Sequence, residues 1–176
     1  RAIIEKTGKP HNVHFHYVTL PFGLERLYFA SQPTMYLYYI LWQWKAYKTA
    51  LRLHKQTPFD LAHHVTWGSL QLGSFIYKLG IPFVFGPAGG GQKAPEAFKS
   101  YFGKYWRAEQ KREAVTKWML KFTPACRQML KKANMLLVAN KETFTMAKAN
   151  GALHTSMVLD VALPESFYPR QQIVKN

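Results

Sequence analysis

The chain is poor in acidic residues, in cysteine and in long apolar runs. Asp and Glu number 9 against 24 Lys and Arg, which gives a net charge of +15 and an attraction to polyanions such as nucleic acid, anionic membranes or phosphorylated substrates. The only cysteine, Cys126, excludes an intrachain disulfide and a cysteine-based zinc site, and it suits a reducing, cytoplasmic compartment. The longest apolar run, Met35 to Trp42, is far short of the ~20 residues of a membrane span.

What is present is the composition of a globular protein, with 48% hydrophobic and 19% charged residues. Strand-like segments alternate with helix-like segments, which predicts a single Rossmann-like α/β domain over residues 1–176, with a parallel sheet and helices on both faces. We expect strands at Asn12–Leu20, Leu61–Thr66, Ile81–Phe85, Met135–Ala139 and Ser156–Val161. We expect helices at Met35–Lys55, Gly68–Leu79, Lys99–Lys132 (interrupted near Pro124) and Lys141–Asn150.

Ligands of parallel sheets bind outside the carboxyl ends of the strands. The expected ends carry Pro21–Gly23, His63–Trp67, Gly86–Gly91 and Asn140–Glu142. The sequence therefore predicts that a functional site is assembled from these four segments.

Two histidines, His63 and His64, stand near the end of the second expected strand. An imidazole there can polarise a hydroxyl or a leaving group near neutral pH. Successive strand residues point to opposite faces, so the two rings are not expected to share one role. The alternative is that one or both only satisfy backbone hydrogen bonds. No third ligand stands nearby, so we expect no metal.

The segment Gly86–Gly91 reads GPAGGG. Without Cβ atoms at Gly89, Gly90 and Gly91, a ligand can approach the backbone N–H groups, which suit a phosphate or an oxyanion. The pattern is neither a Walker A loop nor G-x-G-x-x-G. A flexible turn is the alternative.

The region from Phe98 to Lys132 mixes aromatic with basic residues. Such a mixture is typical of a helix on an anionic bilayer, and of a nucleic-acid surface that combines phosphate contacts with stacking. It also fits an ordinary helix whose aromatic side chains are in the core. The candidate membrane-facing residues are Lys104, Arg107, Lys111 and Arg112.

Four segments together resemble one family. FDLAHHVTWGS is followed by KLGIPFVFGPAGGG, then by ANKETFTMAKANG and VALPESFYP. This order resembles the amino-terminal domain of family 4 (group 1) glycosyltransferases of the GT-B fold, within a bacterial-type subgroup that has HHVT and GPxGGG segments. The resemblance covers about Asn12 to Pro169.

The resemblance implies a retaining transfer of a sugar from a nucleoside-diphosphate sugar to a hydroxyl acceptor, such as a sugar or a lipid-linked glycan, in polysaccharide or glycolipid synthesis. It implies no essential metal and no tightly bound cofactor. By motif position, His63 or His64 contacts the reacting sugar or acceptor, Thr66 and Trp67 belong to the acceptor site, and Gly89, Gly90 and Gly91 line the cleft near the donor.

The family also has parts that this chain lacks. An amino-terminal strand with a glycine-rich loop normally comes first, and a carboxyl-terminal domain with paired glutamates holds the donor. We therefore expect a chain truncated at both ends and inactive alone, at the inner face of the cytoplasmic membrane. Two alternatives remain open: a non-catalytic sugar- or protein-binding domain of the same fold, and a basic nucleic-acid binder.

Overall fold

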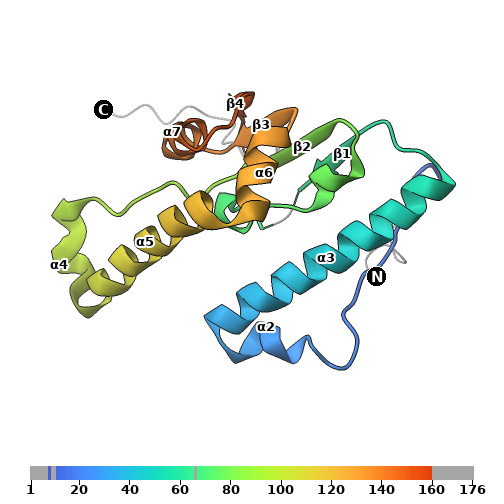
Figure 1. Cartoon of the computed structure of the whole chain (residues 1–176). Helices are drawn as coiled ribbons and strands as arrows, with labels where there is room; N and C mark the ends of the chain where they lie inside the picture. The colour runs from blue at the N-terminus through green and yellow to red at the C-terminus, as the bar shows by residue number, and fades with distance from the viewer. Residues whose placement is uncertain (1–7, 9–10, 66, 160–176) are drawn as a thin grey trace, which may run out of the picture. The chain divides into compact units, whose positions relative to one another are not determined.

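The computed structural model describes residues 8, 11–65 and 67–159 (Figure 1). The chain divides into two compact units, Arg1–Thr49 and Ala50–Asn176. The boundary falls within the long helix α3 (Gln32–Gln56). The expectation of a single domain over the whole chain stays a prediction.

The first unit contains α2 (Arg26–Ala30) and most of α3. The strand predicted at Asn12–Leu20 is wrong, because residues 13–20 form no regular secondary structure and pair with no strand in the described part of the chain. Helix α3 takes up two of their carbonyls instead: Trp42 Nε1 donates to Val18 O at 2.8 Å and Lys45 Nζ donates to Thr19 O at 2.5 Å. Pro21–Gly23 therefore follows no strand.

Helix α3 begins three residues before the predicted start at Met35. Ser31 explains the earlier start, because its hydroxyl accepts from Thr34 N at 3.4 Å while its own N–H donates to Thr34 Oγ1 at 3.0 Å. This reciprocal pair satisfies backbone donors that the first turn of a helix leaves open. The helix ends at Gln56, just before Pro58, as predicted.

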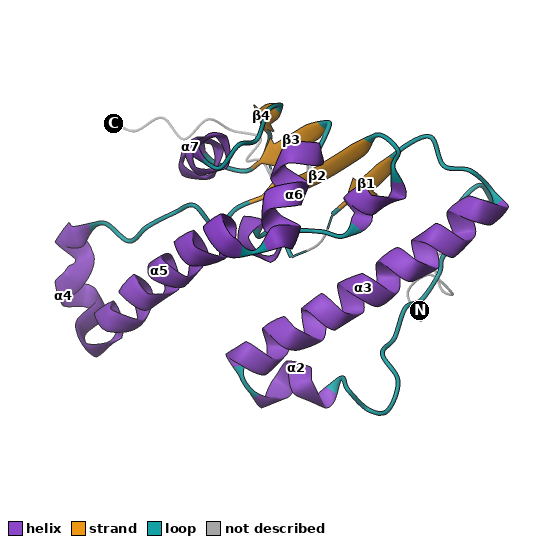
Figure 2. Ribbon diagram, viewed as in Figure 1, coloured by secondary structure: helices purple, strands orange, loops and turns teal. Residues whose placement is uncertain are grey.

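The second unit contains a four-stranded, all-parallel sheet (Figure 2). Its strands are β1 (Ala62–His64), β2 (Phe83–Ala88), β3 (Met135–Val138) and β4 (Thr155–Met157), side by side in chain order. The predicted α/β class with a parallel sheet is therefore confirmed. The strands are shorter than expected at β1 and β4.

The core of this unit lies against one face of the sheet. Alternate residues of β2 and β3 are buried on that face, and they pack against α5 (Trp106–Phe122) and α6 (Pro124–Lys132). Full burial of each large apolar side chain contributes about 1.5–3 kcal/mol. The main contributors are Phe83, Phe85, Leu136, Val138, Leu120, Met129 and Leu130.

The helix predicted at Gly68–Leu79 is wrong. Two short 3-10 turns, η1 (Leu70–Leu72) and η2 (Ile76–Leu79), replace it. Gly73 separates them with a φ of +61°, and a Cβ there would lie 2.9 Å from Cys126 N at the start of α6. The chain turns at Gly73 because α6 packs directly on its backbone.

Strand β2 continues through Ala88, so the loop predicted from Gly86 begins three residues later. Gly86 has a φ of +116°, and a Cβ at this position would collide with Leu137 O of β3. Only glycine fits this close approach of two strands.

The remaining elements follow the prediction more closely. The basic region forms η3 (Glu96–Phe98), α4 (Lys99–Phe102), η4 (Gly103–Tyr105), α5 and α6, with a break at Pro124, and α7 (Lys141–Ala149) follows β3. Within the described ranges no helix is long and apolar enough to cross a membrane. The segment VALPESFYP, which is part of the family resemblance, lies outside the described residues.

Candidate functional site

The carboxyl edge of the sheet brings together three of the four expected segments. The residues after β1 meet the loop after β2, because Ser69 and Gly89 form a parallel bridge and Gly89 N donates to Gly68 O at 2.5 Å. The loop in turn meets the start of α7, where Gly91 N donates to Thr143 Oγ1 at 3.1 Å. A continuous set of contacts thus joins the histidine, glycine and ANKET segments.

His64 is a buried residue on the core side of β1, with 8% of its surface exposed. Its Nδ1 lies 2.7 Å from Ser74 Oγ, which also accepts from Ile76 N at 3.1 Å, and its ring packs against Phe85. Burial, with a smaller contribution from the charge of His63, lowers the pKa of His64 to about 4. A neutral ring therefore connects β1 to the segment before η2 through a side-chain hydroxyl, and not through the backbone hydrogen bond considered as the alternative.

His63 points to the opposite face and is exposed, as the alternation along the strand predicts. Its Nε2 lies 2.8 Å from Gly86 O. A carbonyl only accepts, so Nε2 carries the hydrogen and Nδ1 of the neutral ring is left as an acceptor. Of the two histidines, His63 is the accessible one. Its catalytic role stays a prediction.

Thr66 and Trp67 were also expected at the acceptor site, and the structure describes only Trp67. Trp67 is half-buried, with a φ of +40°, and Thr66 lies outside the described residues. Their assignment to an acceptor site stays a prediction.

Packing requires at least two of the three loop glycines. A Cβ on Gly91 would lie 2.6 Å from Thr143 N and Cα, and one on Gly90, which has a φ of +96°, would lie 3.0 Å from Gln71 Oε1. Gly89 is less confined, because its Cβ would come no nearer than 3.6 Å, to Gly68 O. The amides of Gly89 and Gly91 already donate within the protein, whereas the Gly90 amide has no partner in the described residues. A role for these glycines near a donor stays a prediction.

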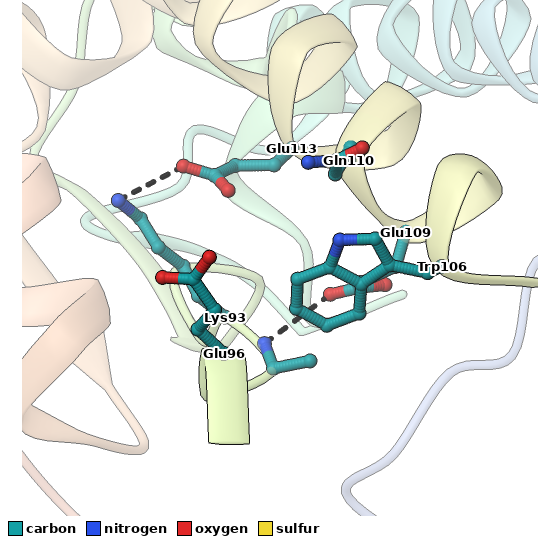
Figure 3. A pocket seen from close by; sticks show the side chains of 7 residues that line it. Lys93, Glu96, Trp106, Glu109, Gln110 and Glu113 are labelled. Carbon is teal, nitrogen blue, oxygen red and sulfur yellow. Dashed lines mark hydrogen bonds and ion pairs between the residues drawn. The ribbon is translucent and has the colours of Figure 1, made fainter. Parts of the chain in front are cut away.

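Helix α5 holds the residues that follow the glycines (Figure 3). Ala94 N donates to Glu109 Oε1 at 3.4 Å, and Lys93 Nζ lies 2.9 Å from Glu113 Oε1. Arg112 donates to Gln92 O at 2.9 Å and to Glu109 at 2.6 Å. A small cavity of about 250 Å³ lies between this loop and α5, with Trp106 in its wall.

Sequence reasoning missed the two carboxylates of α5. Hydrogen bonds from Lys117 and Lys93 lower the pKa of Glu113 to about 2, and a hydrogen bond from Arg112 lowers the pKa of Glu109. Spacing could have shown the local pairs, since Glu109 and Arg112 are three residues apart and Glu113 and Lys117 four. The contact of Glu113 with Lys93 crosses twenty residues and has no local signal.

The outer face of α5 carries basic residues at one end and apolar residues at the other. At helical spacing, Arg107, Lys111, Val115, Trp118 and Phe122 fall on this face, and Trp118 and Phe122 are 61% and 56% exposed. Arg112 falls elsewhere and is engaged by Glu109 and Gln92. Lys104 lies in η4, with its ammonium 5.3 Å from the centre of the Tyr105 ring.

These features define an α/β protein with a parallel sheet and a polar, glycine-lined carboxyl edge. Comparisons with protein-family models, with curated proteins and with solved structures found no match to this chain. Among the described residues, no group of three His, Cys, Asp or Glu side chains could hold a metal ion.

Proposed function

We propose that this chain is the acceptor-side domain of a retaining glycosyltransferase, which transfers a sugar from a nucleoside-diphosphate sugar to a hydroxyl acceptor. The observation that supports it most is the carboxyl edge, where exposed His63 contacts Gly86 and the glycine loop joins the start of α7. Ligands of parallel α/β sheets bind at this edge. A second domain of the enzyme would hold most of the donor.

In this proposal His63 orients the reacting hydroxyl. Its Nε2 is fixed by Gly86 O, so Nδ1 is the atom that can accept a hydrogen bond from an acceptor or donor hydroxyl. His64 supports the strand from the core and does not contact substrate. The Gly90 amide is the loop donor that a ligand oxygen could use.

The test is turnover by the full-length protein with nucleotide-sugar donors. We expect His63→Ala to lower kcat by about tenfold or more while the circular dichroism spectrum is unchanged. His154→Ala is the matched control, because His154 is exposed and precedes β4, the outermost strand. Unchanged turnover in His63→Ala would remove this residue from the mechanism. Acceptor binding without donor binding or turnover would favour the non-catalytic alternative.

We also propose that the outer face of α5 docks on an anionic membrane. The rings of Trp118 and Phe122 pack at a tilt of 42° with their centroids 5.9 Å apart, and the Lys121 ammonium lies over the Phe122 ring. The exposed aromatic rings lie on the same face of α5 as Arg107 and Lys111, and such a face suits both the acyl chains and the anionic headgroups of a membrane interface. Such docking would bring the carboxyl edge to lipid-linked acceptors.

Vesicle flotation tests the docking. We expect recovery with anionic vesicles and not with neutral ones, and loss of recovery in the double variant Trp118→Ser/Phe122→Ser. Leu153→Ser is the control, since Leu153 is also exposed but lies before β4. Equal recovery from both kinds of vesicle would count against docking. Steeply salt-dependent binding to short oligonucleotides, without vesicle binding, would favour the nucleic-acid alternative.

A further inference from the structure

A second cavity, of about 620 Å³, opens beside the glycine loop and is bounded by three elements. Gly91 and Lys93 come from the loop after β2, Lys117 comes from α5, and Lys141 begins a wall formed by α7. Its volume is in the range of pockets that hold small molecules. Three lysines from three separate elements thus line one cavity.

The lysines retain donors for a ligand. Lys93 and Lys117 both bond the same oxygen, Glu113 Oε1, at 2.9 Å and 2.7 Å. An ammonium has three N–H donors, so each keeps two that Glu113 does not use. Lys141 makes no ion pair in the described ranges of the chain. Glu142 also lies in the wall. The three lysines, together with Glu113 and Glu142, therefore carry a net charge of one positive unit.

The loop is anchored so that Lys93 is held in place. Gly91 packs directly on Thr143, Gln92 O accepts from Arg112, and Ala94 N donates to Glu109. A donor held before the ligand arrives loses less conformational entropy on binding.

Helix α7 also gives the cavity an apolar part. Met146 and Ala149 line its wall, together with the polar residues Thr145 and Asn150. The lining therefore fits an anionic group attached to a carbon body rather than a bare ion, because the ammonium groups suit the first and the methyl and thioether groups suit the second.

We infer that this cavity binds the phosphate group of a phosphorylated acceptor, with Lys93, Lys117 and Lys141 as its donors. Naming the ligand an acceptor rests on the proposed glycosyltransferase function. The phosphate site itself rests only on the cavity and its lysines. A sugar phosphate and an isoprenoid phosphate share this chemistry.

Calorimetric titration of the whole chain, without donor, tests the site. The probes are glucose 6-phosphate, citronellyl phosphate and, as the neutral control, glucose. We expect both phosphates to bind and glucose not to bind, with Lys141→Ala weakening the Kd by about five- to tenfold. Lys55→Ala is the matched control, because it removes the same charge from an exposed position at the end of α3. Tighter binding of citronellyl phosphate than of glucose 6-phosphate would identify a lipid-linked ligand, and the reverse a soluble one.

An unchanged Kd in Lys141→Ala would overturn the site, as would equal weakening by Lys55→Ala or equal binding of glucose. A sugar-transfer assay on the full-length protein tests the proposed function independently of phosphate binding. A full-length protein that binds phosphate at Lys141 but transfers no sugar would contradict the transferase and leave the phosphate site standing.

Discussion

Gly91 is the loop position where a side chain has least room, so Gly91→Ala tests the described contact between the glycine loop and α7. Its Cβ would lie 2.6 Å from Thr143 N and Cα and 2.8 Å from Glu142 C, all of them backbone atoms of α7. Overpacking of this kind costs about 1–3 kcal/mol, and loss of the bond from Gly91 N to Thr143 Oγ1 costs about 1 kcal/mol more. We expect the free energy of unfolding to fall by about 2–4 kcal/mol.

Urea unfolding followed by circular dichroism measures this loss. With a slope of about 2 kcal/mol per molar urea, which is typical of small proteins, the midpoint should fall by about 1–2 M. Gly89→Ala is the control from the same loop, because its Cβ would make only ordinary contacts, at 3.6 Å and beyond. Alanine there reduces the entropy of the unfolded chain, so stability should be unchanged or slightly higher. Equal midpoints for the two variants would refute the described packing of the loop on α7.

Three further predictions concern single side chains. His64 has a pKa near 4 when folded and an ordinary value of 6.5, so the unfolded chain binds the additional proton between these pH values. The free energy of unfolding should therefore be highest above pH 6.5 and fall by up to about 3 kcal/mol as the pH drops towards 4. Urea titrations at several pH values measure this fall, and His64→Asn should remove the part of the pH dependence that comes from this histidine. Asn140 caps α7 by accepting from Thr143 N at 2.9 Å and from Thr143 Oγ1 at 2.7 Å. Asn140→Ala should lower the melting temperature, at a loss of about 1 kcal/mol, while Asn140→Asp keeps the cap and should melt near the parent. Burial raises the pKa of the Cys126 thiol to about 12, so a thiol reagent should modify it only after denaturant is added, and rapid labelling of the folded chain would contradict its burial.

The buried strands and the helix after them could be predicted from the sequence. Short apolar runs predicted β2 and β3, because such runs are typical of the buried strands of a parallel sheet. Asn140 and Gly151 bracket α7 as a cap and a stop, so its bounds agree with the prediction to within one residue. These signals depend on residues that are close together in the chain, so they can be recognised in the sequence alone.

The errors arose where distant parts of the chain decide the backbone. Alternation at residues 12–20 predicted a strand, but their carbonyls meet the side chains of α3 rather than another strand. The pattern of Gly68–Leu79 predicted a helix, but the chain turns at Gly73, where α6 packs on its backbone. Neither contact leaves a trace in the neighbouring sequence, since each joins residues far apart in the chain.

The candidate site was predicted in part. The alternation of a strand separated His63 from His64 correctly, but only the structure shows which is buried. The glycines were noted for the room they leave a ligand, and at Gly91 that room is occupied by α7. The lysines of the larger cavity come from three elements, so no motif of fixed spacing could have grouped them.

The order of the sheet has a consequence for how the second unit forms. Each strand pairs with the strand that precedes it in the chain, so β2 can join β1 before any later residue exists. The longest connection between paired strands is residues 89–134, which join β2 to β3. Most of this connection forms α5 and α6, whose helical hydrogen bonds are local. The sheet can therefore be assembled from its amino-terminal side during synthesis, with every new strand meeting a neighbour that is already in place.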